Sequence, residues 1–152
     1  AAAFTAVTPS RLVDTRSGSR VTASSPLTIP VHGAAVTIAG KAVTIPTSAT
    51  GIVVNVVAAN PDRAGFVTVW PCAGPVPLAA NLVYVPGDTR GNGVIAPIGP
   101  DGSICVYSLS PTDIIVDISG WLTGPTDGSG GFTGAVPKRF VDTRYAVGPA
   151  PV

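Results

Sequence analysis

The chain has 152 residues, of which 45% are hydrophobic and only 11% charged, and its formal net charge is +1. This length suits one domain with a single buried core. Its nine Lys and Arg residues form no cluster that would follow a phosphate backbone, which argues against binding to nucleic acid or to an anionic membrane surface. Each apolar run is interrupted before about 18 residues, so no membrane insertion is predicted.

The chain opens with AAAF and has no Met. Small residues at this position are typical of the end of a processed secretory signal, although an expression scar would look similar. We therefore expect an exported protein, secreted or associated with the cell surface.

Short segments rich in Val, Ile, Thr and aromatic residues recur along the chain between turns rich in Gly and Pro. Such segments favour half-buried strands, and no window has the apolar spacing of a helix. The predicted strands are 11–15, 27–33, 42–46, 51–59, 65–71, 81–86, 93–98, 103–109, 113–122 and 139–143.

About ten short antiparallel strands with almost no helix predict an all-β fold, a single β-sandwich of the jelly-roll kind. We expect the core of the sandwich in residues 1–123. The sequence GPTDGSGG (124–131) predicts a Gly/Ser-rich linker. Residues 132–152 then form a terminal strand that packs on a sheet edge, in the same chain or in a neighbour.

That last expectation comes from an internal repeat. FTAVTPSRLVDTR (4–16) aligns without a gap with FTGAVPKRFVDTR (132–144). In an extended strand, alternate residues point to opposite faces, so Asp14 and Arg16 share one face and Arg11 lies on the other. The same holds for the equivalent residues of the second copy: Asp142 and Arg144 on one face, Arg139 on the other.

We interpret these residues as a structural ion-pair motif that fixes the register of a strand. Two alternatives stay open. Asp14 and Asp142 would be the paired carboxylates of a glycosidase-like site, or the Arg residues would recognise a ligand. An Asp bound to Arg has a lowered pKa, which is the wrong direction for a general acid.

Two polar residues interrupt strongly apolar strands: Asn55 in IVVNVV and Asp117 in IIVDIS. A buried carboxylate needs a partner, and Arg11 or Arg139 would provide one for Asp117. The alternatives are a solvated strand face and, less favoured, a metal ligand. No group of Asp residues has calcium-loop spacing, so no metal site is predicted.

Cys72 and Cys105 are the only cysteines. In an exported chain such a pair predicts a disulfide, with two free buried thiols as the alternative.

Aromatic residues offer a different kind of site. Phe66, Trp70 and Tyr84 lie on predicted strands and form a possible platform for stacking sugar rings, although core packing explains such residues more often.

Apart from the disfavoured alternative for Asp14 and Asp142, nothing in the sequence indicates catalysis, and nothing indicates a cofactor. There is no Glu, no GxSxG motif, and the single histidine, His32, has no acid or nucleophile beside it in sequence. We expect no enzyme activity.

The quoted segments together resemble a repeated β-rich domain of secreted and cell-wall proteins in actinobacteria and related bacteria. The family pattern opens with P-x-R-L-(L/V)-D-T-R, which 9–16 matches. ATGIVVNVVAANPDRAGFVTVWPCAGPVP (49–77), AANLVYVPGDT (79–89) and IIVDISGWL (114–122) match the strands that follow. The resemblance implies an extracellular, non-enzymatic surface module of structural or adhesive role.

Two functions follow as expectations. The first is a structural module that assembles with itself through its repeated terminal strand. The alternative is a carbohydrate-binding module that recognises cell-wall or environmental polysaccharide. The expected partners are accordingly the chain itself or a cell-surface glycan.

Overall fold

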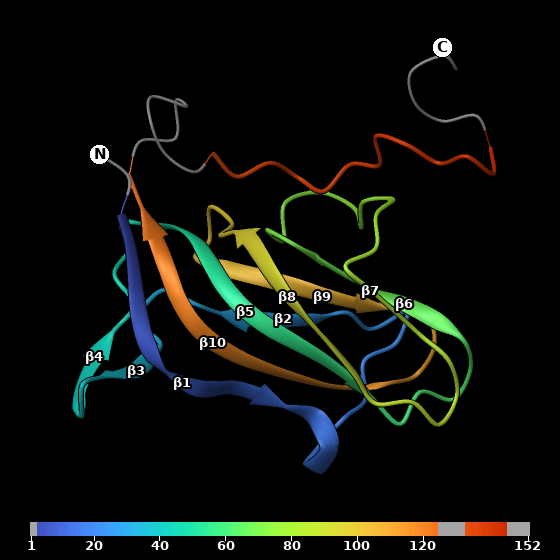
Figure 1. Cartoon of the computed structure of the whole chain (residues 1–152), viewed down its shortest axis with the longest axis horizontal. Helices are drawn as coiled ribbons and strands as arrows, with labels where there is room; N and C mark the ends of the chain where they lie inside the picture. Colours follow the sequence, from blue (N-terminus) through green and yellow to red (C-terminus); the bar gives the residue numbers. More distant parts are fainter. Residues whose placement is uncertain (1–2, 125–132, 146–152) are drawn as a thin grey trace.

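The computed structural model describes residues 3–124 and 133–145 (Figure 1). Residues 1–2, 125–132 and 146–152 lie outside this description, and with them nearly all of the predicted linker. Ten strands and one 3-10 turn make up the regular structure of the described residues. They are β1 (Ala3–Asp14), η1 (Thr15–Ser17), β2 (Leu27–Pro30), β3 (Ala35–Ile38), β4 (Lys41–Thr44), β5 (Ala49–Ala59), β6 (Gly65–Trp70), β7 (Leu82–Tyr84), β8 (Arg90–Pro97), β9 (Ser103–Ser108) and β10 (Asp113–Thr123).

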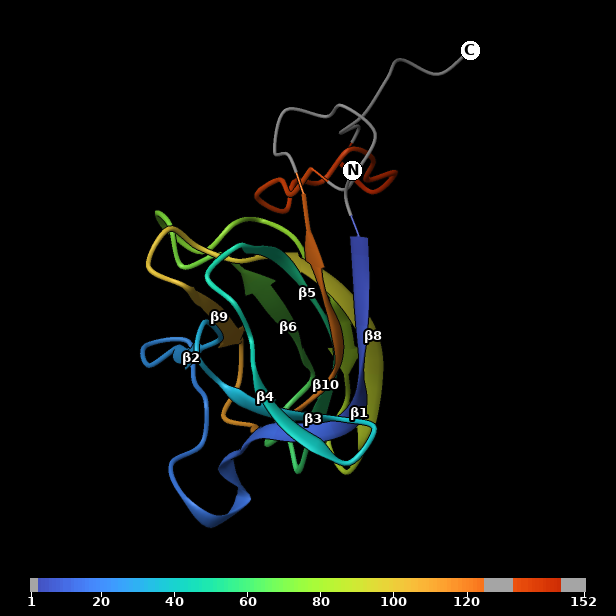
Figure 2. The ribbon, with the colours of Figure 1, turned by 90° about the vertical axis from the view of Figure 1, so that its left-hand side faces the viewer.

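The strands form two antiparallel sheets packed face to face (Figure 2). One sheet has the order β4-β3-β1-β10-β5-β8, and the other has the order β2-β9-β6-β7. When the β3–β4 hairpin is set aside, each sheet has four strands in the order of a jelly roll, in which the first strand pairs with the last. The predicted all-β sandwich is therefore confirmed.

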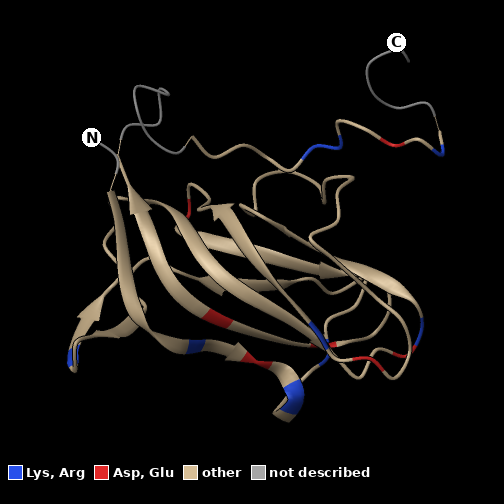
Figure 3. Cartoon of the chain, in the orientation of Figure 1, with Lys and Arg blue, Asp and Glu red and all other residues tan. Residues whose placement is uncertain are grey.

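The core lies between the two sheets and is built from the inward-facing residues of both. On β5 these are Ile52, Val54 and Val56, and on β6 they are Val67 and Val69. Their spacing of two residues is the strand periodicity that the sequence displays. Charged residues lie mostly in turns and near strand ends, and those on β1 and β10 are the main exception on the sheet faces (Figure 3).

One strand was missing from the prediction. In AVTIAGKAVT only the second half was predicted to be extended, whereas β3 and β4 form a complete hairpin. Ala39 and Gly40 have φ angles of 47° and 79°. Two central residues with positive φ are typical of a tight type I′ hairpin turn. Ala is an unusual residue for the first of these positions, so the sequence signal was weak.

The disulfide is confirmed: Cys72 and Cys105 are bonded, with their Cα atoms 4.9 Å apart. Cys72 follows β6, and Cys105 lies on β9 beside it. The bond therefore joins the loop after β6 to the adjacent strand of the same sheet.

Candidate functional site

The first copy of the repeat, residues 11–16, ends strand β1 and begins the 3-10 turn. Strand β1 pairs with β10 along most of its length, with Arg11 opposite Asp117 and Val13 opposite Val116. Leu12 is therefore the extra residue of a bulge. Nε of Arg11 donates to Oδ1 of Asp117 at 2.9 Å. Of the two partners predicted for Asp117, Arg11 is the one observed.

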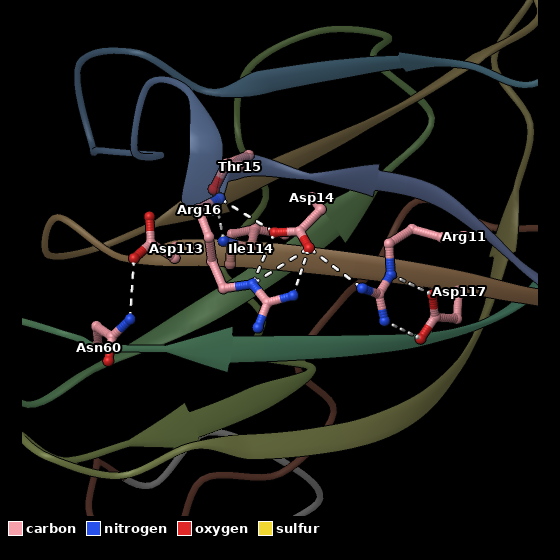
Figure 4. A network of polar contacts seen from close by, with 8 residues as sticks. All are labelled: Arg11, Asp14, Thr15, Arg16, Asn60, Asp113, Ile114 and Asp117. Atoms are coloured by element: carbon pink, nitrogen blue, oxygen red, sulfur yellow. Dashed lines mark hydrogen bonds and ion pairs between the residues drawn. The ribbon is translucent and has the colours of Figure 1, made fainter.

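Asp14 is the centre of the first motif (Figure 4). Nη2 of Arg16 donates to its Oδ2 at 2.6 Å, and Nη1 of Arg11 donates to the same oxygen at 3.2 Å. The main-chain N of Arg16 donates to Oδ1 at 3.1 Å. Hydrogen bonds from Arg16, with the nearby charge of Arg11, lower the pKa of Asp14 from 3.8 to about 2.

Thr15 joins this motif to the sheet. Its Oγ1 accepts a hydrogen bond from the main-chain N of Ile114 at 2.8 Å, and Thr15 is only 6% exposed. The bond satisfies a buried N–H of β10. Thr15 was not among the predicted site residues, although its repetition as Thr143 was an available signal.

The second copy, residues 139–144, has the same internal geometry. Nη1 of Arg139 donates to Oδ2 of Asp142 at 2.9 Å, and Nη2 of Arg144 donates to the same oxygen at 2.9 Å. The main-chain N of Arg144 donates to Oδ1 at 3.1 Å, as Arg16 does to Asp14. Hydrogen bonds from Arg144 lower the pKa of Asp142 to about 2. The predicted ion-pair motif thus has the same form in both copies.

The surroundings of the two copies differ. In the first, Leu12 and Val13 pack against the core. In the second, the equivalent Phe140 is 79% exposed and Val141 is 58% exposed. Thr143 is exposed as well, whereas Thr15 is buried.

Two details of the predicted motif need correction. Residues 139–143 were expected to be a strand, but residues 133–145 contain none, and they cross one end of the sandwich (Figures 1 and 2). Arg11 and Arg139 were placed on the faces opposite Asp14 and Asp142, but each donates a hydrogen bond to the Asp three residues later in its own copy.

The first motif was predicted to lie at a sheet edge, but β1 is not an edge strand. This strand lies between β10 and β3, although β3 meets it only at the pair Thr8 and Thr37. In the described chain, residues 133–145 occupy no sheet edge of their own sandwich. Packing of these residues on the edge of a neighbouring chain stays a prediction.

The three aromatic residues of the predicted sugar platform do not form an exposed surface. Trp70 is 4% exposed, and Tyr84 is 1% exposed and belongs to the core. The hydroxyl of Tyr84 lies 2.7 Å from Oγ of Ser108, inside the sandwich. Only Phe66 of the three is partly exposed, and its ring lies 5.8 Å from that of Tyr107. The platform as predicted is therefore wrong.

A second polar cluster lies beside the first motif and was not predicted. Nη1 of Arg20 donates to Oδ1 of Asp62 at 2.7 Å. Nδ2 of Asn60 donates to Oδ2 of Asp113 at 3.1 Å (Figure 4). These bonds tie the chain before β2 and the turn after β5 to the start of β10. Their residues are far apart in sequence, so no local pattern indicates them.

The geometry of both motifs is poorly suited to acid–base chemistry. Each Asp is held ionised by two Arg residues, whereas a general acid needs a raised pKa. Residues 3–124 and 133–145 contain no cluster of three or more His, Cys, Asp or Glu side chains arranged to hold a metal ion. Within the same ranges, no helix has the length and hydropathy needed to cross a bilayer.

Comparisons of the chain with protein-family models, with curated proteins and with solved structures found no match.

Proposed function

We propose that this protein is a non-catalytic structural module of the cell exterior, which associates with other copies of itself through residues 133–145. The observation that carries the proposal is the contrast between the two motifs. Both have the same Asp-centred hydrogen bonds, but only the first is docked on a strand. An ordered segment with exposed apolar side chains is typical of an interaction site.

Two further features support the extracellular and structural parts of the proposal. The Cys72–Cys105 disulfide is of a kind that persists in oxidising compartments. The sheet faces carry few charged residues, which is compatible with a module that packs against other protein surfaces.

Solution mass provides the direct test. The full chain is expected to show a mass that rises with concentration in sedimentation equilibrium, and deletion of 132–152 is expected to leave a monomer. The double variant Phe140→Ser/Val141→Ser is the finer comparison, because it keeps chain length and the Asp142 hydrogen bonds. A full chain that is monomeric at every concentration would contradict the proposal.

A carbohydrate-binding function is the second candidate, supported by the partly exposed pair of Phe66 and Tyr107. Two neighbouring rings on a sheet face can stack a sugar. Binding of the full chain to cell-wall polysaccharide, lost in Phe66→Ala and retained in Phe140→Ala, would favour this function over self-association.

A further inference from the structure

We infer that the acceptor for the second motif is the segment of β10 that the first motif covers, in a second copy of this chain. Residues 139–144 of one copy would replace residues 11–16 on β10 of the next. This inference rests on the proposed self-association and names the surface that takes part in it.

The acceptor has three features that recognise the motif. Main-chain pairing runs from Ile115 to Ile118, the partners of β1 residues 10–14. Asp117 binds an Arg side chain. The N–H of Ile114 donates to a Thr hydroxyl. Together these features bind the main chain, the Arg side chain and the Thr hydroxyl of one motif.

The donor presents the matching groups at the same spacing. Arg139, Val141 and Thr143 correspond to Arg11, Val13 and Thr15 in the gapless alignment. The turn around Asp142 is already formed as it is around Asp14, so docking would not have to order it. Preorganisation of this kind lowers the entropic cost of binding.

The first motif is held in a way that allows replacement. On the side away from β10, strand β1 meets β3 only at Thr8 and Thr37. Its pairing with β10 is interrupted between Ala6 and Ser10. Displacement of residues 11–16 would therefore break only the pairs of Arg11, Val13 and Asp14 with β10, and the incoming segment can form these pairs again.

On the acceptor, the exchange forms again the main-chain pairs, the Arg–Asp117 bond and the Thr–Ile114 bond that it breaks. The main free-energy cost of the exchange is then the translational and rotational freedom that two molecules lose when they associate. The exchange should therefore depend strongly on protein concentration. Because one copy donates at residues 139–144 and accepts at β10, the contact is head-to-tail and leads to chains of molecules or to closed rings.

Cross-linking between full-length variants tests the acceptor directly. One variant carries Arg139→Cys and the other Asp117→Cys, since residues 11 and 117 are direct partners across β1 and β10. The control partner carries Lys41→Cys, an exposed position at the start of β4. The double variant Arg11→Cys/Asp117→Cys reports whether this position accepts a disulfide within one chain.

Docking on β10 predicts that the 139–117 heterodimer exceeds the 139–41 heterodimer by roughly tenfold or more, because docking raises the effective concentration of the thiols. Equal yields, or no 139–117 product while the intrachain control forms, would overturn the inference. If the unmodified chain still associates in that case, the proposed function stands with another acceptor. If it is monomeric, both fail.

Two threonine variants provide a second measurement without new cysteines. Thr15→Val weakens the hold of the first motif on Ile114, so association should tighten by about tenfold. Thr143→Val weakens the donor, so association should loosen by a similar factor. Equal effects of the two variants, or effects of opposite sign to these, would contradict exchange at β10.

Discussion

Oγ1 of Thr15 accepts a hydrogen bond of 2.8 Å from the main-chain N of Ile114, across 99 positions of sequence. The same six-residue pattern recurs at 139–144 with the same Asp-centred bonds, yet Thr143 is exposed. The local sequence thus determines the turn, and contact with β10 determines whether the turn is docked. Comparison of matched substitutions in the two copies separates these effects.

The threonine pair makes the first prediction. Thr15→Val leaves the buried N–H of Ile114 without its acceptor, so we expect the free energy of unfolding to fall by about 1–3 kcal/mol. For a chain of this size the melting temperature falls by roughly 2–4 °C for each kcal/mol. Thr143→Val is the matched control and should leave the melting temperature of the monomer unchanged. Thermal denaturation at low protein concentration measures both, and equal effects would show that Thr15 does not hold β1.

The second prediction concerns Gly120, where β10 lies close to the first half of β1. A Cβ atom there would lie 2.5 Å from the carbonyl O of Thr5 and would contact the ring of Phe4. Gly120→Ala should therefore push the first half of β1 away from β10, with a cost of about 1–3 kcal/mol. Gly93→Ala on β8 is the control, because a Cβ atom at that position meets nothing within 4 Å. Urea denaturation of both variants checks this, and a Gly120→Ala midpoint as high as that of Gly93→Ala would contradict it.

The lowered pKa of Asp14 makes the third prediction. Its pKa is about 2 in the folded chain against an ordinary value of 3.8. A lowered pKa stabilises the fold fully above the unfolded value, and this contribution is lost as pH falls from about 4 to about 2. We expect the urea midpoint to fall over this range, and to fall less in Asp14→Asn, which has no carboxylate to protonate at this position. An identical acid response of the two proteins would contradict the role of Asp14.

Much of the fold was predictable because strand signals are local. Segments rich in Val and Ile, with Gly and Pro between them, indicated β5, β6, β9 and β10 close to their true bounds. The ion-pair motif was predictable for the same reason, since Asp14 bonds residues two and three positions away.

The remainder depends on packing, which no local pattern records. The segment 139–143 has the composition of a strand but belongs to neither sheet of the described residues. Trp70 shares a strand face with the partly exposed Phe66, yet it is only 4% exposed, and Tyr84 belongs to the core. The register of β1 with β10, which makes Leu12 the extra residue of a bulge, likewise depends on contact between distant segments.

The disulfide makes the last prediction. Cys72 and Cys105 are 33 positions apart, and on the chain-entropy model a loop of this length stabilises the fold by about 3–4 kcal/mol. Cys72→Ala/Cys105→Ala should therefore lower the melting temperature by roughly 10 °C. Because the bond joins the loop after β6 to β9, away from β1 and β10, the variant should keep the concentration-dependent mass of the full chain. Sedimentation below the new melting temperature checks this, and loss of association would place the disulfide loop in the contact between copies.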